Sequence, residues 1–259
     1  MKFNEDNVIK EIKDNGYCVI DDFLDKENLE NIKKSLLQTF NYIQKDDETD
    51  LQKKFYKIKK YNKKLKGNWY DLAGRNMALL QYLHQDRIVN LVKKYFNTDV
   101  VFSGRSCIGA YDDENDHLLE PHQETKQISR DSILLWAPLF DTNKNLGGLR
   151  VYKDSHKHGY FDHTLDHPLG DKGWTNQYTH VDRSISSKFE PIDLEVKAGQ
   201  VVLMISNVLH CGYPNKKKGS VRLTVCERYN PLQKIPYLRD PKAEMKIPYT
   251  GVDYNKILD

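Results

Sequence analysis

The stretch QVVLMISNVLHCGYPNKKKGSVRLTVCERY, residues 200–229, contains the pattern that decides the fold class. Its two ends are rich in strand-forming residues, and the turn-forming run YPNKKKGS separates them, as is typical of antiparallel strands joined by a hairpin. Similar short strand-like runs begin at residue 99, and few helical segments come between them. The pattern therefore argues against parallel β-α-β units and predicts a jelly roll.

The part of the chain before residue 97 predicts mainly helices. Residues 5–40 follow the pattern of a helix, a short strand at 16–20 and a second helix that Asp25 can cap. A further amphipathic helix is predicted at 77–96. Together these patterns predict a mainly β protein with a double-stranded β-helix core and N-terminal helices packed on one sheet.

The predicted organisation is a single domain. No repeat or low-complexity linker divides the sequence. We expect one domain over residues 1–259, with a mainly helical flank (1–98), a jelly-roll core (99–230) and a C-terminal extension (231–259).

The composition argues against two classes of partner. The 40 basic and 37 acidic residues give a net charge of only +3, which does not suggest a nucleic-acid-binding protein. No apolar run is long enough for a membrane helix, and the first residues lack the apolar core of a secretory signal. The four cysteines form no C-x-x-C pair, which fits reduced thiols. We therefore predict a cytoplasmic protein.

The segment EPHQETKQ, residues 120–127, contains the first candidate metal ligands. In an extended segment His122 and Glu124 project from the same face, while Gln123 points the other way. Both side chains could therefore reach one ion. A polar loop with no metal is the alternative interpretation of this triplet alone.

His210 is the candidate third ligand. It follows an apolar strand and lies 88 positions after His122 (210 − 122). Two histidines and one carboxylate, split into a close pair and a distant third, match the facial triad of non-haem Fe(II) oxygenases. A purely structural histidine near a strand end is the alternative.

The alternation in SVRLTVCERY predicts an arginine inside the jelly roll. Arg222 and Thr224 fall on one face of this strand, opposite the apolar Val221 and Leu223. A buried guanidinium needs an anionic partner, and a dicarboxylate cosubstrate would supply one through a bidentate pair. A structural salt bridge to an internal carboxylate is the alternative.

Three segments resemble the phytanoyl-CoA dioxygenase family of Fe(II)- and 2-oxoglutarate-dependent oxygenases. They are IKDNGYCVIDDFLDKENLENIKKSL, LLWAPLFDTNKNLGGLRVYKDSHKHG and LEVKAGQVVLMISNVLHCGYPNKKKGSVRLTVCERYNP. The resemblance implies Fe(II), 2-oxoglutarate as cosubstrate and dioxygen. It implies that His122, Glu124 and His210 bind the iron. It further implies that Arg222 binds the distal carboxylate of 2-oxoglutarate and that Thr224 adds a hydroxyl bond.

The sequence departs from the family pattern in two places. The carboxylate ligand is more often aspartate, whereas here it is Glu124. The usual Pro-Gly before Ser-His is replaced by Lys153-Asp154, which indicates a changed turn. Halogenating relatives lack the carboxylate ligand, so Glu124 favours hydroxylation of a C–H bond.

Candidate substrate residues surround the mouth of the predicted barrel. The long polar and aromatic segment 160–190 could form a lid, with Trp174, Tyr178 and His180 over the metal, or a surface loop. Arg105 and Tyr111 precede the H-x-E segment and could face the cavity. Because polar and cationic candidates outnumber apolar ones, we expect a small polar or anionic metabolite.

The sequence thus predicts an Fe(II)/2-oxoglutarate-dependent hydroxylase, and two alternatives stay open. One is a jelly-roll protein that holds a metal or a sugar without catalysis. The other is a zinc-dependent hydrolase or isomerase, because two histidines and a glutamate also suit zinc.

Overall fold

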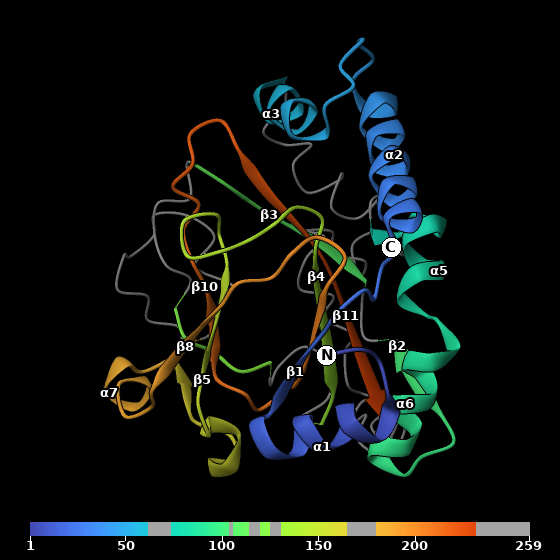
Figure 1. Cartoon of the computed structure of the whole chain (residues 1–259). Helices are drawn as coiled ribbons and strands as arrows, with labels where there is room; N and C mark the ends of the chain where they lie inside the picture. The colour runs from blue at the N-terminus through green and yellow to red at the C-terminus, as the bar shows by residue number, and fades with distance from the viewer. Residues whose placement is uncertain (62–73, 104–105, 114–119, 125–130, 165–179, 232–259) are drawn as a thin grey trace, which may run out of the picture.

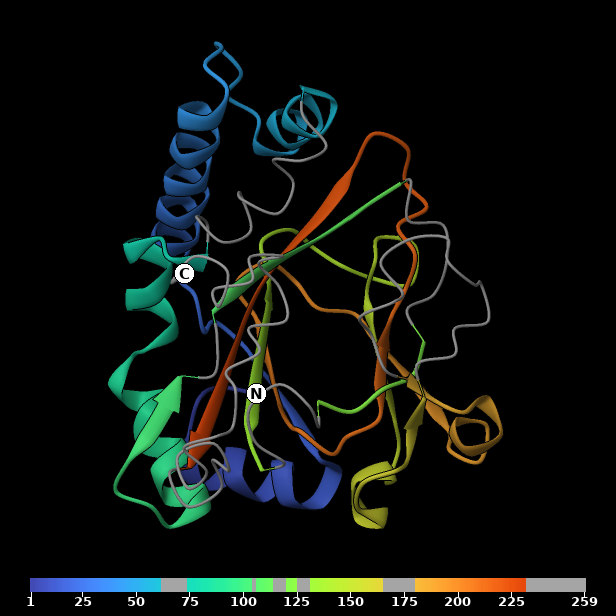
Figure 2. The same ribbon diagram turned by 180° about the vertical axis from the view of Figure 1, so that it is seen from behind.

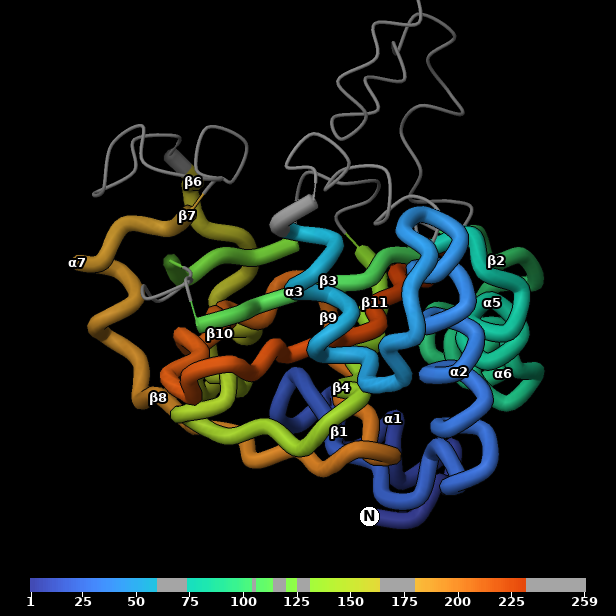
Figure 3. Tube along the Cα trace, turned by 90° about the horizontal axis from the view of Figure 1, so that it is seen from above, coloured from blue at the N-terminus to red at the C-terminus, as the bar shows by residue number. Residues whose placement is uncertain are grey.

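The helices and sheets of the protein form three layers (Figure 1). The computed structural model describes residues 1–61, 74–103, 106–113, 120–124, 131–164 and 180–231. Seen from above, helices lie on one side of a larger sheet and a smaller sheet lies on its other side (Figure 3). This architecture confirms the predicted jelly roll with N-terminal helices on one sheet.

The helical layer has a capping residue at Asp25, where the sequence predicts one. Its helices are α1 (Glu5–Asn15), α2 (Lys26–Ile43), α3 (Leu51–Tyr61), α5 (Met77–Leu83) and α6 (Asp86–Phe96). Asp25 caps α2 by accepting a hydrogen bond of 2.7 Å from the backbone of Asn28. α1 ends at Gly16, whose φ of 83° suits glycine. None of the helices in the described residues combines the length and hydrophobicity that a membrane span requires.

The prediction of one continuous helix over residues 77–96 is wrong. The chain forms α5 and α6 with a break at His84 and Gln85, where Gln85 adopts an extended backbone. The break turns the His84 side chain toward the larger sheet, where its Nε2 lies 3.2 Å from Glu227. A polar contact in the tertiary structure therefore overrides the helical periodicity.

The larger sheet is antiparallel and is covered on both faces. Its order is β1 (Tyr17–Ile20), β9 (Val201–Ile205), β4 (Ile133–Pro138), β11 (Val221–Pro231) and β2 (Val101–Ser103), with β3 (Cys107–Asp112) also paired to β11. All six residues of β4 are buried, because the helices cover one face and the smaller sheet covers the other. One hydrophobic cluster lies on each side of the sheet.

The smaller sheet contains β10 (His210–Gly212), β5 (Leu149–Tyr152) and β8 (Pro191–Leu194), in that order (Figure 2). The shorter elements beside it are η2 (Ser155–His158), β6 (His163–Thr164), β7 (His180–Val181) and α7 (Arg183–Ser186).

The predicted hairpin between His210 and Arg222 is wrong. β10 pairs with β5 in the smaller sheet, whereas β11 pairs with β3, β4 and β2 in the larger sheet. Residues 213–220 therefore cross from one sheet to the other. The turn-forming run does connect the two strands, but it joins two different sheets. The side chains of His210 and Arg222 can therefore face one interior from opposite walls.

β11 divides its side chains between the two faces of the larger sheet. Val221, Leu223, Val225 and Tyr229 belong to the cluster beneath the helices, and Cys226 packs against the cluster between the sheets. Even-numbered residues of β11 therefore face the interior of the jelly roll.

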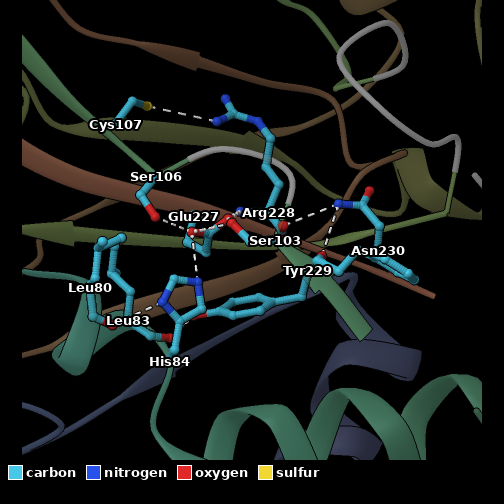
Figure 4. Close-up of polar contacts among 11 residues, drawn as sticks. Leu80, Leu83, His84, Ser103, Ser106, Cys107, Glu227, Arg228, Tyr229 and Asn230 are labelled. Atoms are coloured by element: carbon cyan, nitrogen blue, oxygen red, sulfur yellow. Dashed lines mark hydrogen bonds and ion pairs between the residues drawn. The ribbon is translucent and has the colours of Figure 1, made fainter. Parts of the chain in front are cut away.

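Glu227 is the buried polar residue on the helical side of β11 (Figure 4). Its carboxylate accepts hydrogen bonds from Ser103 at 3.0 Å, from Ser106, and from the backbone of Arg228 at 2.7 Å. Burial alone would raise the pKa of Glu227, but the contacts from His84 and Ser106 lower it. The network holds β11 to the helical layer through His84. Because successive residues of a strand alternate, Arg228 lies on the opposite face.

Candidate metal site

Backbone pairing places the two predicted histidine ligands opposite each other. The N–H of His122 donates to the carbonyl of His210 at 2.9 Å, and the N–H of His210 donates to the carbonyl of His122 at 3.0 Å. This exchange makes His122 an added edge residue beside β10. Directly opposed residues project to the same side, and the imidazole centroids lie 4.4 Å apart.

Gln123 fixes this segment from the other side. Its Nε2 donates to the carbonyls of Gly159 at 2.9 Å and Asn207 at 2.6 Å, and its Oε1 accepts from the backbone of Phe161 at 2.9 Å. The side chain is buried, so these bonds hold a fixed conformation. The sequence predicts that Gln123 points away from the metal but does not predict this clamp.

Hydrogen bonds to backbone carbonyls select the tautomer of both histidines. Nδ1 of His122 lies 2.9 Å from the carbonyl of Glu120, and Nδ1 of His210 lies 3.0 Å from the carbonyl of Val208. Each Nδ1 must therefore carry the proton, which leaves a lone pair on Nε2. Burial lowers the pKa of His122 to about 4 and also lowers the pKa of His210, so both rings are neutral at neutral pH.

Glu124 supplies an ionised carboxylate to the same point. Its Oε1 lies 3.9 Å from Nε2 of His122 and 3.9 Å from Nε2 of His210. Arg228 donates from Nε at 3.0 Å and from Nη2 at 3.1 Å to the two carboxylate oxygens. Burial opposes ionisation, but the Arg228 guanidinium outweighs it and holds the pKa of Glu124 at about 2.

These three side chains fit a divalent metal ion. Their donor atoms all lie within 4.8 Å of one another. The set contains two neutral imidazole nitrogens and one carboxylate oxygen, and each carboxylate oxygen keeps a lone pair beyond its bond to Arg228. That donor set is the facial triad of Fe(II) oxygenases and also suits zinc.

Arg222 lies on the interior face of β11, as its alternation predicts. Its guanidinium stacks over the ring of Tyr111 at 4.1 Å and lies 5.8 Å from the ring of Trp136. Nη1 donates to the carbonyl of Gly147 at 2.7 Å, and the residue is only 7% exposed. The interior therefore presents a fixed cation on β11, the strand that also carries Arg228.

Two glycines make room for this part of the interior. Gly147 has a φ of +70°, and a Cβ there would lie 3.2 Å from Cδ of Arg222. A Cβ at Gly109 would lie 2.8 Å from Oγ1 of Thr224. Thr224 is buried opposite Gly109 in the β3–β11 register, with its hydroxyl 3.4 Å from the Gly109 carbonyl. The turn at Gly147 thus leaves the space that the Arg222 side chain occupies.

The predicted substrate residues are only partly within the described residues. Tyr111 is the cross-strand partner of Arg222, so it supports that guanidinium. His180 is buried in β7, beside Val181, whose backbone donates to the carbonyl of Pro121 at 2.7 Å. It therefore lies near the H-x-E segment. Arg105, Trp174 and Tyr178 lie outside the described residues, as does most of the predicted lid.

Arg228 is the main residue that the sequence interpretation missed. It lies on the same face of β11 as Arg222 and Thr224, so extending the alternation from Thr224 through Cys226 to Arg228 would have placed it in the interior. Its partner Glu124 lies 104 positions away along the chain (228 − 124). No local pattern pairs these two residues.

Comparison with known families gives one match over most of the chain. The family described as phytanoyl-CoA dioxygenase matches residues 12–222. No curated protein matches the sequence.

Several solved structures share the fold at low sequence identity. The apo form of ThoJ, a non-heme monooxygenase, has a TM-score of 0.61 and 14% identity over 88% of this chain and 77% of its own. The epimerase SnoN, in complex with Fe³⁺, α-ketoglutarate and nogalamycin RO, has a TM-score of 0.58 and 14% identity over 96% and 92%. The α-ketoglutarate-dependent carbocyclase SnoK has a TM-score of 0.57 and 12% identity over 88% and 86%. At these identities the likeness shows the fold alone.

Proposed function

This chain belongs to the phytanoyl-CoA dioxygenase family, and from that premise we propose that it is an Fe(II)/2-oxoglutarate-dependent dioxygenase that hydroxylates a C–H bond. The observation that carries the proposal is the convergence of two neutral imidazoles and one ionised carboxylate within 4.8 Å. We further propose a single domain over the whole chain, acting in the cytoplasm. Four free cysteines support a reducing compartment.

Each residue of the triad has a defined part in this function. Nε2 of His122, Nε2 of His210 and an oxygen of Glu124 hold the iron. When bound, iron supplies dioxygen activation coupled to decarboxylation of 2-oxoglutarate. Backbone carbonyls fix both imidazoles and Arg228 fixes the carboxylate, so the ligand geometry is set before cofactors bind.

Arg222 is proposed to hold the distal carboxylate of 2-oxoglutarate. The guanidinium is buried between aromatic rings, where a bidentate pair with a carboxylate is stronger than in water. The hydroxyl of Thr224 lies two residues further along the same face and can add a hydrogen bond. The two residues orient the cosubstrate from the wall opposite the smaller sheet.

Hydroxylation is the outcome that the ligand set favours. Glu124 occupies the position that halogenating relatives leave without a carboxylate. SnoN and SnoK are named as an epimerase and a carbocyclase, so proteins that share this fold carry out different reactions. The residues of the substrate pocket, and not the fold, therefore decide the reaction. We propose a small polar or anionic metabolite, with His180 close to it and Tyr111 behind Arg222.

The test combines a spectrum with product analysis. Anaerobic addition of Fe(II) and then 2-oxoglutarate is expected to give a visible charge-transfer band, because the keto acid chelates the iron. Admission of oxygen with a screen of polar metabolites is expected to release succinate and to yield a product heavier by one oxygen. Hydrolysis or isomerisation that needs zinc and no 2-oxoglutarate would establish the zinc alternative. Metal or sugar binding without a band or succinate would establish the non-catalytic alternative.

Replacing Arg228 with methionine tests the support of Glu124. Without the guanidinium, burial raises the pKa of Glu124, so the carboxylate is protonated up to a higher pH and competes less well for metal. We expect Co(II) affinity to fall roughly 10- to 100-fold, as for loss of other groups that orient a ligand. The loss should be larger at acidic than at neutral pH in calorimetric titrations.

Arg150→Met is the matched control for this variant. Arg150 pairs with Asp193 and stacks over Tyr213, but its side chain is on β5 away from the triad. Its replacement should leave Co(II) affinity unchanged. An Arg228→Met protein that is folded by circular dichroism and binds Co(II) with the wild-type pH profile contradicts the assignment.

A further inference from the structure

A pair of cysteines lies in the interior between the two arginines of β11. Thr224, Cys226 and Arg228 share the interior face with Arg222, and Cys226 is directly opposite Cys107 of β3. The two thiols are hydrogen-bonded to each other. The triad and the cosubstrate arginine use neither sulfur.

We propose that Cys107 and Cys226 are an oxidation site at which a peroxide forms a reversible disulfide across β3 and β11. This inference goes beyond the proposed function and does not depend on it. The disulfide would link the two strands between Arg222 and Arg228.

The register of the strands supplies the required geometry. Directly opposed residues of antiparallel strands have Cβ atoms roughly 4.5–5.5 Å apart, and a disulfide needs roughly 3.5–4.5 Å, so a small closure suffices. Both cysteines are partly exposed, whereas Cys18 and Cys211 are buried in hydrophobic clusters. An oxidant therefore has easier access to the pair than to the other two thiols.

The electrostatics give the two sulfurs different roles. The hydrogen bond from Cys226 lowers the pKa of Cys107, and the Arg228 guanidinium, whose Nη1 lies 3.8 Å from the sulfur, adds to this effect against burial (Figure 4). The pKa of Cys226 is raised by the same hydrogen bond and by burial. Cys107 is therefore the attacking thiolate and Cys226 the resolving thiol.

The chemistry balances with hydrogen peroxide as oxidant. The Cys107 thiolate attacks one peroxide oxygen and the O–O bond breaks, which leaves a sulfenic acid and a hydroxide that takes a proton to become water. The Cys226 sulfur, after losing its proton, attacks the Cys107 sulfur. The S–O bond breaks and a second water leaves. The two thiols lose two electrons and two protons in total.

Peptide mapping of the metal-free protein tests the proposal. The full chain is treated with a chelator and then hydrogen peroxide, alkylated under denaturing conditions and digested with trypsin without reduction. We expect the peptide of residues 106–126, which holds Cys107, to be linked to the peptide of residues 223–228, which holds Cys226. Reductant should separate them. Cys18 and Cys211 should be recovered as alkylated thiols.

Serine variants separate the two roles. In Cys226→Ser, Cys107 should accumulate as a sulfenic acid that a dimedone probe labels, and in Cys107→Ser no sulfenic acid should form at residue 226. Cys211→Ser should still form the linked peptides. The proposal is overturned if the linked peptides are absent from the treated wild-type protein, or if Cys18 and Cys211 oxidise as fast as the pair. No iron or 2-oxoglutarate enters this assay, so its outcome is independent of the catalytic proposal.

Discussion

Replacing His210 with alanine is expected to abolish metal-dependent activity and to weaken Co(II) binding by more than about 100-fold, the upper range for loss of a group that only supports a ligand. The variant removes one of two neutral nitrogens and leaves the ionised Glu124 facing a cavity with a single imidazole. Because β10 holds residue 210 through its backbone pairs with Val151 and His122, the alanine should keep the local fold. Calorimetric titration with Co(II) measures the loss.

His158→Ala is the control for this prediction. His158 is exposed at the end of η2 and makes an edge-on contact with Phe189, so its loss should leave Co(II) affinity unchanged. If His210→Ala and wild type bind Co(II) equally well while both are folded, the two-histidine site is wrong.

Replacing Arg222 with alanine is expected to raise the Kd for 2-oxoglutarate by about 100-fold or more, because the cosubstrate carboxylate would be buried without its partner. Co(II) affinity should stay within a few-fold of wild type, since Arg222 donates to the Gly147 carbonyl and stacks on Tyr111, whereas Arg228 is the arginine that holds Glu124. Titration of 2-oxoglutarate into the Co(II)-loaded protein measures this difference.

Arg150→Met again gives a matched comparison, because it removes a guanidinium that also stacks on a tyrosine. It should bind 2-oxoglutarate like wild type, and Arg222→Lys should keep part of the affinity through its charge. Equal losses of Co(II) and 2-oxoglutarate in Arg222→Ala would show that Arg222 serves the fold and not the cosubstrate.

Local sequence patterns predicted several features of this protein correctly. The cap at Asp25 and the short strand between the first two helices depend on neighbouring residues, which a sequence displays directly. The alternation of β11 placed Arg222 and Thr224 on one face for the same reason. The period of a strand gives the side on which a residue lies.

Pairing between distant segments is where the sequence interpretation failed. The predicted hairpin after His210 assumed that neighbouring strands pair, whereas the jelly roll sends β10 and β11 to different sheets. The prediction of a single helix over 77–96 did not include Glu227, which is remote in sequence and contacts His84 at the break between α5 and α6. Both errors arose because contacts of high sequence separation outweighed local preference.

The sequence by itself determined the residue types and the faces: a histidine and a carboxylate on one side of an extended segment, a later histidine after a strand, and an arginine on the inner face of another. The tertiary structure alone decided that His122 pairs with His210, that Gln123 clamps the segment, and that Arg228 meets Glu124 and Cys107. The physical reason is that periodicity is a local property of the backbone. The partner of a buried charge depends on which sheets pack together, and that is settled only when the whole core forms.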